Sequence, residues 1–145
     1  MASPPPRGVT LIELLVTLAI VGVLAALAYP GFRGHLLRAH RTEAMTSLLA
    51  LAAAQERHFL VHRAYATTLE GPDPGLPITP LTASGRYRLS ISPHPDGGYL
   101  AAATALSEGP QGADQHCAVL TLDSSGSRRA FAASGEDSTA SCWGR

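Results

Sequence analysis

The hydrophobic pattern of this chain is dominated by an apolar run from Val9 to Tyr29 that carries one charge, Glu13. A helix rises about 1.5 Å per residue, so the run would cover roughly 30 Å, the thickness of a bilayer's hydrocarbon core. The run therefore predicts a transmembrane helix over residues 9–29. Glu13 is the anomaly, because a carboxylate in hydrocarbon is costly unless it snorkels to the interface or is paired.

A second helical pattern follows Pro30. Apolar residues recur near helical spacing while most charged residues fall elsewhere, which predicts an amphipathic half-helix over residues 30–63 that can cover a sheet. The apolar positions are Leu37, Ala44, Leu48, Leu51, Ala52 and Phe59. Because proline lacks a backbone donor and clashes with the preceding turn, we expect a kink or a loosened helix at Pro30.

The rest of the chain predicts an antiparallel sheet. Prolines and glycines exclude long regular structure from residues 64–85, which are expected to form a connecting loop. Three runs with strand character follow, and a shorter fourth run comes after a turn. These runs are Arg86–Ser92, Gly98–Leu106, Cys117–Asp123 and Arg128–Ala132. Since Asp96-Gly97 supplies hairpin turn chemistry, residues 86–145 are expected to form an antiparallel sheet of three or four strands. The helix is expected to pack on this sheet, which gives an α+β fold.

Composition limits the chemistry that this chain can perform. Its 145 residues fit one domain with a thin core, and its eleven basic residues balance its eleven acidic residues. The sequence holds no hydrolase, metalloprotease or nucleotide-binding motif. His58 and His62 stand at i and i+4 on the helix, but no third metal ligand lies nearby in the sequence. We therefore expect no enzyme activity, no cofactor and no metal.

Two cysteines, Cys117 and Cys142, lie in the part of the chain that should sit outside the cytoplasm. Oxidising compartments favour disulfides, and small domains need them for stability. A disulfide between the two is therefore predicted, against the alternative of two free buried thiols.

A short polar leader, Met1 to Gly8, precedes the apolar run. A secretory signal peptide is cut after its apolar region, which is then discarded. In this chain the junction between polar and apolar residues comes before the run, so that a cut at this junction would keep the run in the mature protein.

Several positions of this stretch match a known pattern. They are Gly8, the VTLIEL that follows it with Glu13 fifth after the glycine, Gly22 and the Tyr29-Pro30 pair. Together they resemble the class III leader of type IV pilins and pseudopilins. The resemblance implies a type IV pilin fold, cleavage by prepilin peptidase between Gly8 and Val9, methylation of the new amine at Val9, and helix breaks at Gly22 and Pro30. Val9 departs from the pattern, because the first mature residue is usually Phe.

The carboxyl-terminal region is also similar to the family. Cys117 with VLTLDSSG, and the later Cys142-Trp143, resemble the disulfide-bounded region of PilE-type minor pilins. The resemblance implies a minor pilin of a type IV pilus that serves twitching motility, adhesion or DNA uptake. Before assembly the protein would cross the inner membrane once with a periplasmic carboxyl-terminal domain, and afterwards it would belong to a fimbrium at the cell surface. Its partners would be other pilin subunits, prepilin peptidase, the membrane and the inner-membrane assembly platform.

Glu13 has a candidate role in assembly. The most available cation near it is the amine at Val9, either of the same chain or of a neighbouring subunit, and pairing would offset the cost of the buried carboxylate. The resemblance to the pilin family implies the same pairing.

Two alternatives stay open, a type II secretion pseudopilin and a DNA-binding competence pilin. A DNA receptor would use a basic stripe on phosphates, for which the candidates are Arg86, Arg88, Arg128 and Arg129. Four arginines without an aromatic platform more often form a solvated face, so DNA is the less favoured partner. A calcium site would favour a major pseudopilin, but the available acids lack EF-hand spacing. These acids are Asp114, Asp123, Glu136 and Asp137.

Overall fold

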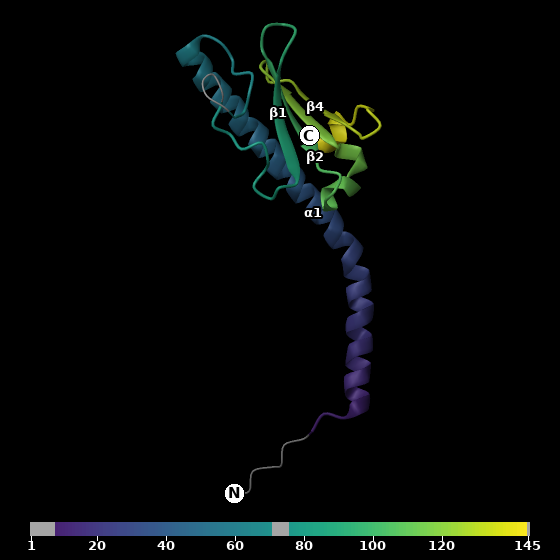
Figure 1. The fold of residues 1–145 in the computed structure, drawn as a ribbon. Helices are drawn as coiled ribbons and strands as arrows, with labels where there is room; N and C mark the ends of the chain where they lie inside the picture. Colours follow the sequence, from purple (N-terminus) through teal and green to yellow (C-terminus); the bar gives the residue numbers. More distant parts are fainter. Residues whose placement is uncertain (1–7, 71–75, 145) are drawn as a thin grey trace, which may run out of the picture. The chain divides into compact units, whose positions relative to one another are not determined.

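The computed structural model describes residues 8–70 and 76–144 (Figure 1). Its elements are the helix α1 (Leu11–His62), the strands β1 (Tyr87–Pro93), β2 (Tyr99–Ala105), β3 (Val119–Asp123) and β4 (Arg128–Phe131), the 3-10 turns η1 (Pro110–Ala113) and η2 (Gln115–Cys117), and the short helix α2 (Thr139–Cys142). The chain divides into two compact units, one ending at Leu36 and the other beginning at Leu37. The predicted leader lies outside the described residues except for Gly8.

The first unit contains the amino-terminal part of α1. Among the described residues, no single helix is long and apolar enough to cross a membrane, although the segments Leu11–Leu27 and Phe32–His62 meet the criteria of length and composition as a pair. Helix α1 runs through both Gly22 and Pro30. Neither residue ends the helix, because a proline removes only one helical hydrogen bond. A local loosening of the helix at these positions stays a prediction.

The second unit confirms the α+β class and the antiparallel meander. The sheet has the order β1-β2-β3-β4, so each strand pairs with its neighbour in sequence. One row of the register joins Leu89 to Ala103, Ala103 to Leu120, and Leu120 to Ala130. Side chains alternate between the two faces of a sheet. This row therefore lies on one face, where all four residues are buried in the core that also contains the carboxyl-terminal part of α1.

Helix α1 buries one stripe of its second half in this core. Ala44, Leu48 and Leu51 are fully buried, at the i, i+4 and i+7 spacing of one helical face. Each leucine contributes about 1.5–3 kcal/mol of hydrophobic free energy when fully buried. The sequence pattern therefore identified the packed face, although Leu37 and Phe59 are only half-buried.

A buried glutamine, which the hydrophobic pattern missed, holds the chain where it leaves the helix. Gln55 continues the buried stripe and is fully buried. Its Nε2 donates to the carbonyl of Ala66 at 2.8 Å, and its Oε1 accepts from the amide of Ala66 at 2.9 Å. One side chain thus satisfies both backbone groups of a residue that has no strand partner, as burial of polar groups requires.

A buried polar network joins α1 to the turns η1 and η2. Arg41 donates two hydrogen bonds to the carboxylate of Asp114, at 2.5 and 2.7 Å. Gln111 donates to Asp114 and to the hydroxyl of Tyr87, both at 2.9 Å, and its Oε1 accepts from Nδ1 of His40 at 3.0 Å. Burial, together with the nearby charge of Asp114, raises the pKa of Tyr87 to about 12, so this hydroxyl stays neutral.

We expect the substitution Arg41→Leu to lower the free energy of unfolding by about 3 kcal/mol, because it leaves the carboxylate of Asp114 as a buried charge without its cation. This is the lower end of the usual range, since the Arg41 side chain is 20% exposed while that of Asp114 is 3% exposed. Urea unfolding of the full chain in detergent micelles, followed by circular dichroism, measures the change. The exposed Arg38, one turn earlier, is the control, and a similar loss in Arg38→Leu would contradict the prediction.

Candidate functional site

The amino-terminal start of α1 is defined by Thr10. Its carbonyl accepts a hydrogen bond from the amide of Leu14 at 3.2 Å, and its Oγ1 accepts from the amide of Glu13 at 3.3 Å. These bonds make Thr10 the N-cap of the helix. Gly8 and Val9 therefore lie before the helix, where both are exposed. The predicted cleavage bond joins two residues outside the helix.

Glu13 occupies the third position of the helix, where a capping-box acid usually stands. A carboxylate in the first turn is stabilised by about 0.3–1 kcal/mol through the helix dipole at an exposed site. Sequence reasoning singled out Glu13 but missed Thr10, although the Thr-x-x-Glu spacing is a recognised signal for a helix start. Glu13 thus stands at a fixed place in the first helical turn.

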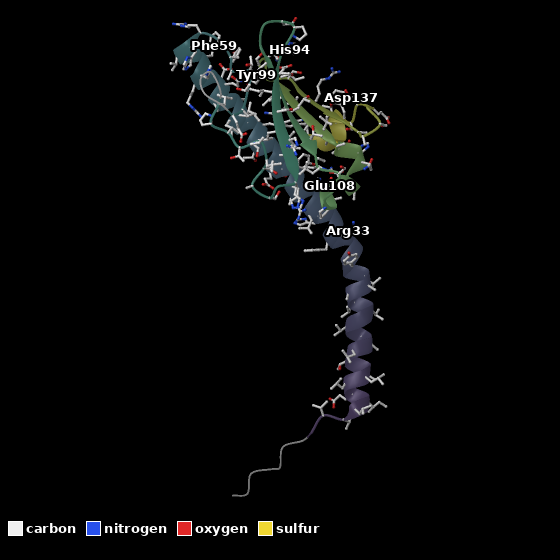
Figure 2. All side chains as sticks on the ribbon, in the orientation of Figure 1. Arg33, Phe59, His94, Tyr99, Glu108 and Asp137 are labelled. Carbon is white, nitrogen blue, oxygen red and sulfur yellow. A yellow bond between two sulfur atoms is a disulfide. The ribbon has the colours of Figure 1, made fainter. Side chains whose placement is uncertain are left out.

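The segment from Leu11 to Leu27 exposes apolar side chains on all sides of the helix, as Figure 2 shows. Leu11 is 83% exposed, Leu18 is 63% exposed and Leu27 is 74% exposed. A helix that is apolar all round needs an apolar environment, which is either lipid or neighbouring helices. This part of the chain therefore requires an apolar environment around it.

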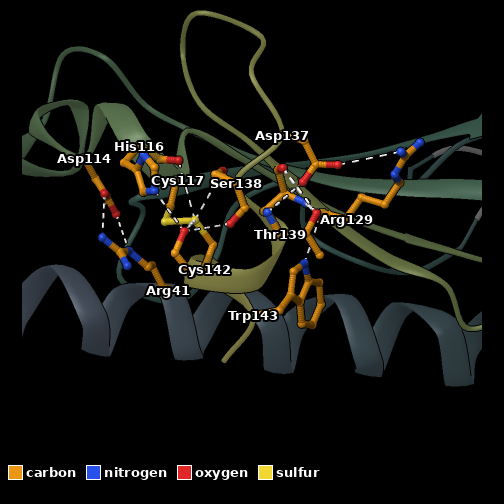
Figure 3. The surroundings of a disulfide bond; sticks show 12 residues. Arg41, Asp114, His116, Cys117, Arg129, Asp137, Ser138, Thr139, Cys142 and Trp143 are labelled. Atoms are coloured by element: carbon orange, nitrogen blue, oxygen red, sulfur yellow. Dashed lines mark hydrogen bonds and ion pairs between the residues drawn. A yellow bond between two sulfur atoms is a disulfide. The ribbon is translucent and has the colours of Figure 1, made fainter. Parts of the chain in front are cut away.

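The predicted disulfide is present (Figure 3). Cys117 lies at the end of η2 and Cys142 at the end of α2, with their Cα atoms 5.8 Å apart. Both residues are buried, at 0% and 5% exposure. The bond ties the segment that follows β4 back to the turn that precedes β3. Small domains with thin cores commonly depend on such links.

The structure does not bring the four predicted arginines together. Arg88 lies on the outer face of β1, whereas Arg129 lies on the outer face of β4, at the opposite edge of the sheet. The guanidinium of Arg129 lies 3.7 Å from the carboxylate of Asp137. Arg128 points the other way and lies 5.4 Å from the centre of the Trp143 ring. Arg86 is half-buried. The predicted stripe is therefore absent from the sheet face, because neighbouring residues of a strand point to opposite faces.

Three of the four acids considered for calcium, Asp114, Asp123 and Asp137, have other partners. Asp114 binds Arg41. Hydrogen bonds from the Ser125 side chain, and from the amides of Ser125 and Ser127, lower the pKa of Asp123 against the opposing effect of burial. Within residues 8–70 and 76–144, no group of three or more His, Cys, Asp or Glu side chains is placed to hold a metal ion.

His58 and His62 stack on each other. Their ring centroids are 4.3 Å apart with 25° between the planes, and Nδ1 of His58 lies 2.9 Å from the carbonyl of Ala64. Stacked rings do not direct two nitrogens at a shared ion, so the arrangement is that of a packed pair at the end of the helix.

These features define a class of protein with an apolar amino-terminal helix that needs external cover and a helix-on-sheet unit closed by a disulfide. A family model described as "Type IV minor pilin ComP, DNA uptake sequence receptor" matches residues 30–121, and one described as "Prokaryotic N-terminal methylation motif" matches residues 6–29. The chain belongs to the type IV pilin family. Members of this family are structural subunits that assemble with one another and are not known as enzymes.

Two curated relatives show how widely the likeness extends. The type II secretion system core protein G of Klebsiella pneumoniae is 32% identical over 108 residues, which cover 74% of this chain and 71% of that protein. The type IV major pilin PilA of Myxococcus xanthus is 47% identical over 57 residues, which are 39% of this chain and only 26% of that protein. Pilins and secretion pseudopilins are thus both among the relatives.

A type IV pilin structure from Shewanella oneidensis is also similar, with 23% sequence identity and a TM-score of 0.47. The match covers 75% of this chain and 99% of that one.

Proposed function

We propose that this chain is a minor pilin of a type IV pilus, which enters or primes the filament for motility, adhesion or DNA uptake. The observation that carries the proposal is the apolar helical segment from Leu11 to Leu27, which is exposed on all sides and starts just after Gly8. Before assembly this segment would anchor the protein in the inner membrane with the sheet unit in the periplasm. Residues 9–29 would form the membrane span and residues 30–63 the half-helix that packs on the sheet.

Assembly would exchange one apolar environment for another. The apolar helical segment would leave the lipid and pack among the helices of neighbouring subunits, with the inner-membrane platform guiding the transfer. Lipid tails are as apolar as leucine, so the exchange costs little hydrophobic free energy, and van der Waals packing decides the outcome. A subunit can therefore enter a filament, and leave it again, without a large change in hydrophobic burial.

Processing would create the charge that Glu13 needs. Cleavage by prepilin peptidase between Gly8 and Val9 leaves an amine one residue before the Thr10 cap. The helix N-terminus already stabilises the carboxylate of Glu13 in part. The amine of a neighbouring subunit, presented at the same depth, would neutralise this carboxylate more completely than the amine of its own chain. Both charges are then matched at only one axial position of the incoming subunit, which sets its register.

Two other functions have specific support. The match to core protein G covers most of the chain and favours a secretion pseudopilin. The disulfide and the Cys142-Trp143 tail instead favour the pilus, and a deletion strain scored for surface filaments, twitching and protein secretion would separate the two. DNA reception is favoured by the description of the family model over residues 30–121. The dispersal of Arg88, Arg128 and Arg129 weighs against it.

We expect the mature protein to begin at a methylated Val9, because the scissile bond precedes the helix and the apolar run is retained. Mass spectrometry of protein taken from sheared filaments measures the mass of the amino-terminal peptide. A strain without prepilin peptidase is the control and should keep Met1 or Ala2 at the amino terminus. An unprocessed leader in assembled filaments would disprove the cleavage.

We expect Glu13→Ala to leave cleavage and membrane insertion intact while reducing incorporation into filaments at least about tenfold, since a matched charge pair in an apolar surrounding is lost. Immunoblots of sheared filaments against the membrane pool measure the ratio. Glu43→Ala is the control, because Glu43 lies on α1 in the sheet unit, where its carboxylate accepts from the amide of Ser84. Normal incorporation of Glu13→Ala would return Glu13 to the role of a helix-capping acid.

We expect binding to duplex DNA no tighter than about 10⁻⁶ M at roughly 150 mM salt, because dispersed arginines contact few phosphates at once. Fluorescence anisotropy with a labelled duplex, repeated over a salt series, measures the affinity and its salt dependence. Submicromolar binding that is lost in the Arg128→Ala, Arg129→Ala double variant would refute this expectation and favour the DNA receptor.

A further inference from the structure

Strand β4 is the last strand of the sheet. Its outer edge is covered by the chain's own carboxyl-terminal tail, residues 136–144. The amide of Ser138 donates to the carbonyl of Ala130 at 2.9 Å, and the amide of Ala132 donates to the carbonyl of Glu136 at 2.9 Å. The amide of Ala130 donates to Oγ1 of Thr139, also at 2.9 Å. An exposed edge strand offers such groups to other chains, so native proteins usually cover it.

The end of the tail also packs against β4. The indole Nε1 of Trp143 donates to the carbonyl of Arg129 at 2.8 Å (Figure 3). The guanidinium of Arg128 lies over the same indole ring. Backbone groups of Ala130 and Ala132 thus bond to tail residues on either side of the bridge between Phe131 and Asp137.

One covalent bond holds the tail in place. Cys142 is joined to Cys117, which lies outside the tail in η2. On its other side the tail is connected to β4 only through a tight turn, in which the amide of Gly135 donates to the carbonyl of Ala132 at 2.9 Å. Gly135 has a φ of 87°, a conformation suited to glycine. The four-residue helix α2 is too short to be stable alone.

We propose that the β4 edge is an interaction surface for the tail of a second copy of this chain, and that the Cys117–Cys142 disulfide keeps it occupied by the tail of its own copy. The fit of the partner is visible in the structure. A second copy's tail carries the same Ser138 amide, Glu136 carbonyl and Thr139 hydroxyl that already match this edge. Exchange of an identical segment between two copies is a low-cost route to association.

The exchange is coupled to the redox state of the two cysteines. A dithiol reductant attacks one sulfur through its thiolate, forms a mixed disulfide, and resolves it with its second thiol. The products are two cysteine thiols and one oxidised reductant, with two electrons and two protons transferred to the protein. Both sulfurs are buried, and Sγ of Cys142 lies 3.4 Å from the Ser138 hydroxyl. A local opening around the two sulfurs must therefore precede reduction, and the tail leaves the β4 edge only after the bond is reduced.

Mixed isotope labelling tests the exchange on the full chain in detergent micelles. Equal amounts of ¹⁴N and ¹⁵N protein are mixed, reduced with dithiothreitol without denaturant, concentrated and reoxidised in air. Mass spectrometry of the Cys117–Cys142 peptide pair then reports its isotopes. Exchange predicts that about half of the swapped pairs carry one light and one heavy peptide, because partners are chosen at random. The same mixture without reduction is the control and should give none. Pairs of a single isotope throughout would overturn the proposal.

The rate of amide hydrogen exchange distinguishes a swap of tails between two copies from random formation of disulfides between thiols. On reduction, the Ala130 and Ala132 amides should exchange at least about tenfold faster while the amides of β2 stay protected, because only the edge opens. Reoxidation should restore their protection in the mixed-isotope species. Loss of protection across the whole sheet would show that the bond is a general staple, and mixed pairs without restored protection would show adventitious oxidation, so either result overturns the proposal.

A pair of variants repeats the test without reductant. The Cys117→Ser, Cys142→Ser double variant should exchange its Ala130 and Ala132 amides as fast as the reduced protein. The Ser134→Ala variant keeps the disulfide and changes only an exposed turn residue. The amides of this control should exchange as slowly as those of the native chain. Faster exchange of its Ala130 and Ala132 amides would show that the disulfide alone does not hold the tail on β4, which would contradict the proposal.

Discussion

Burial of one stripe of α1 against the inner face of the sheet is the interaction on which the carboxyl-terminal unit depends. Leu48 and Leu51 supply large side chains from the helix, while the central strand β2 contributes the small Ala101 and Ala103 to the same core. Small residues on the sheet limit the apolar area that folding removes from water. A unit of this size gains only a modest hydrophobic free energy, so other interactions have to add to it.

The additional interactions join parts of the chain that lie far apart in the sequence. Gln55 holds the backbone at Ala66, where the chain leaves the helix. The pair of Arg41 and Asp114 joins residues 73 positions apart and anchors the turns before β3. The disulfide closes the region after β4. Buried polar groups of this kind are costly when unpaired, so each one also excludes alternative packings of the same segments.

The amino-terminal part of α1 differs from the sheet unit, because its apolar side chains must be covered by another molecule. Its apolar side chains are exposed, and none of the described residues of its own compact unit covers them. That requirement suits a filament subunit, since the same surface is compatible with lipid before assembly and with other helices afterwards. Pilins and secretion pseudopilins share it, which accounts for relatives of both kinds. The differences between them are expected on the exposed surface of the sheet unit, where Arg88 and Arg129 lie at opposite edges.

The sequence alone determined the elements and their order. A run of 21 residues with one charge, an interval rich in proline, and strict alternation around Tyr87 and Leu89 predict a helix, a loop and strands through local periodicity, which does not depend on distant partners. The start of α1 at Thr10 could also be predicted from the sequence, because the Thr-x-x-Glu spacing is local. The pairing of Cys117 with Cys142 was predicted because both cysteines lie in a small domain that is expected outside the cytoplasm.

Only the tertiary structure decided which residues meet across the fold. Gln55 looks like an ordinary polar helix residue, and its burial depends on where the chain returns at Ala66. Strand pairing and side-chain alternation separated Arg128 from Arg129, adjacent in sequence, onto opposite faces of the sheet. The tail's cover of β4 depends on long-range backbone hydrogen bonds and on the disulfide, which local periodicity does not encode. Periodicity thus specifies which face of an element is buried, and the register of the whole sheet decides what that face touches.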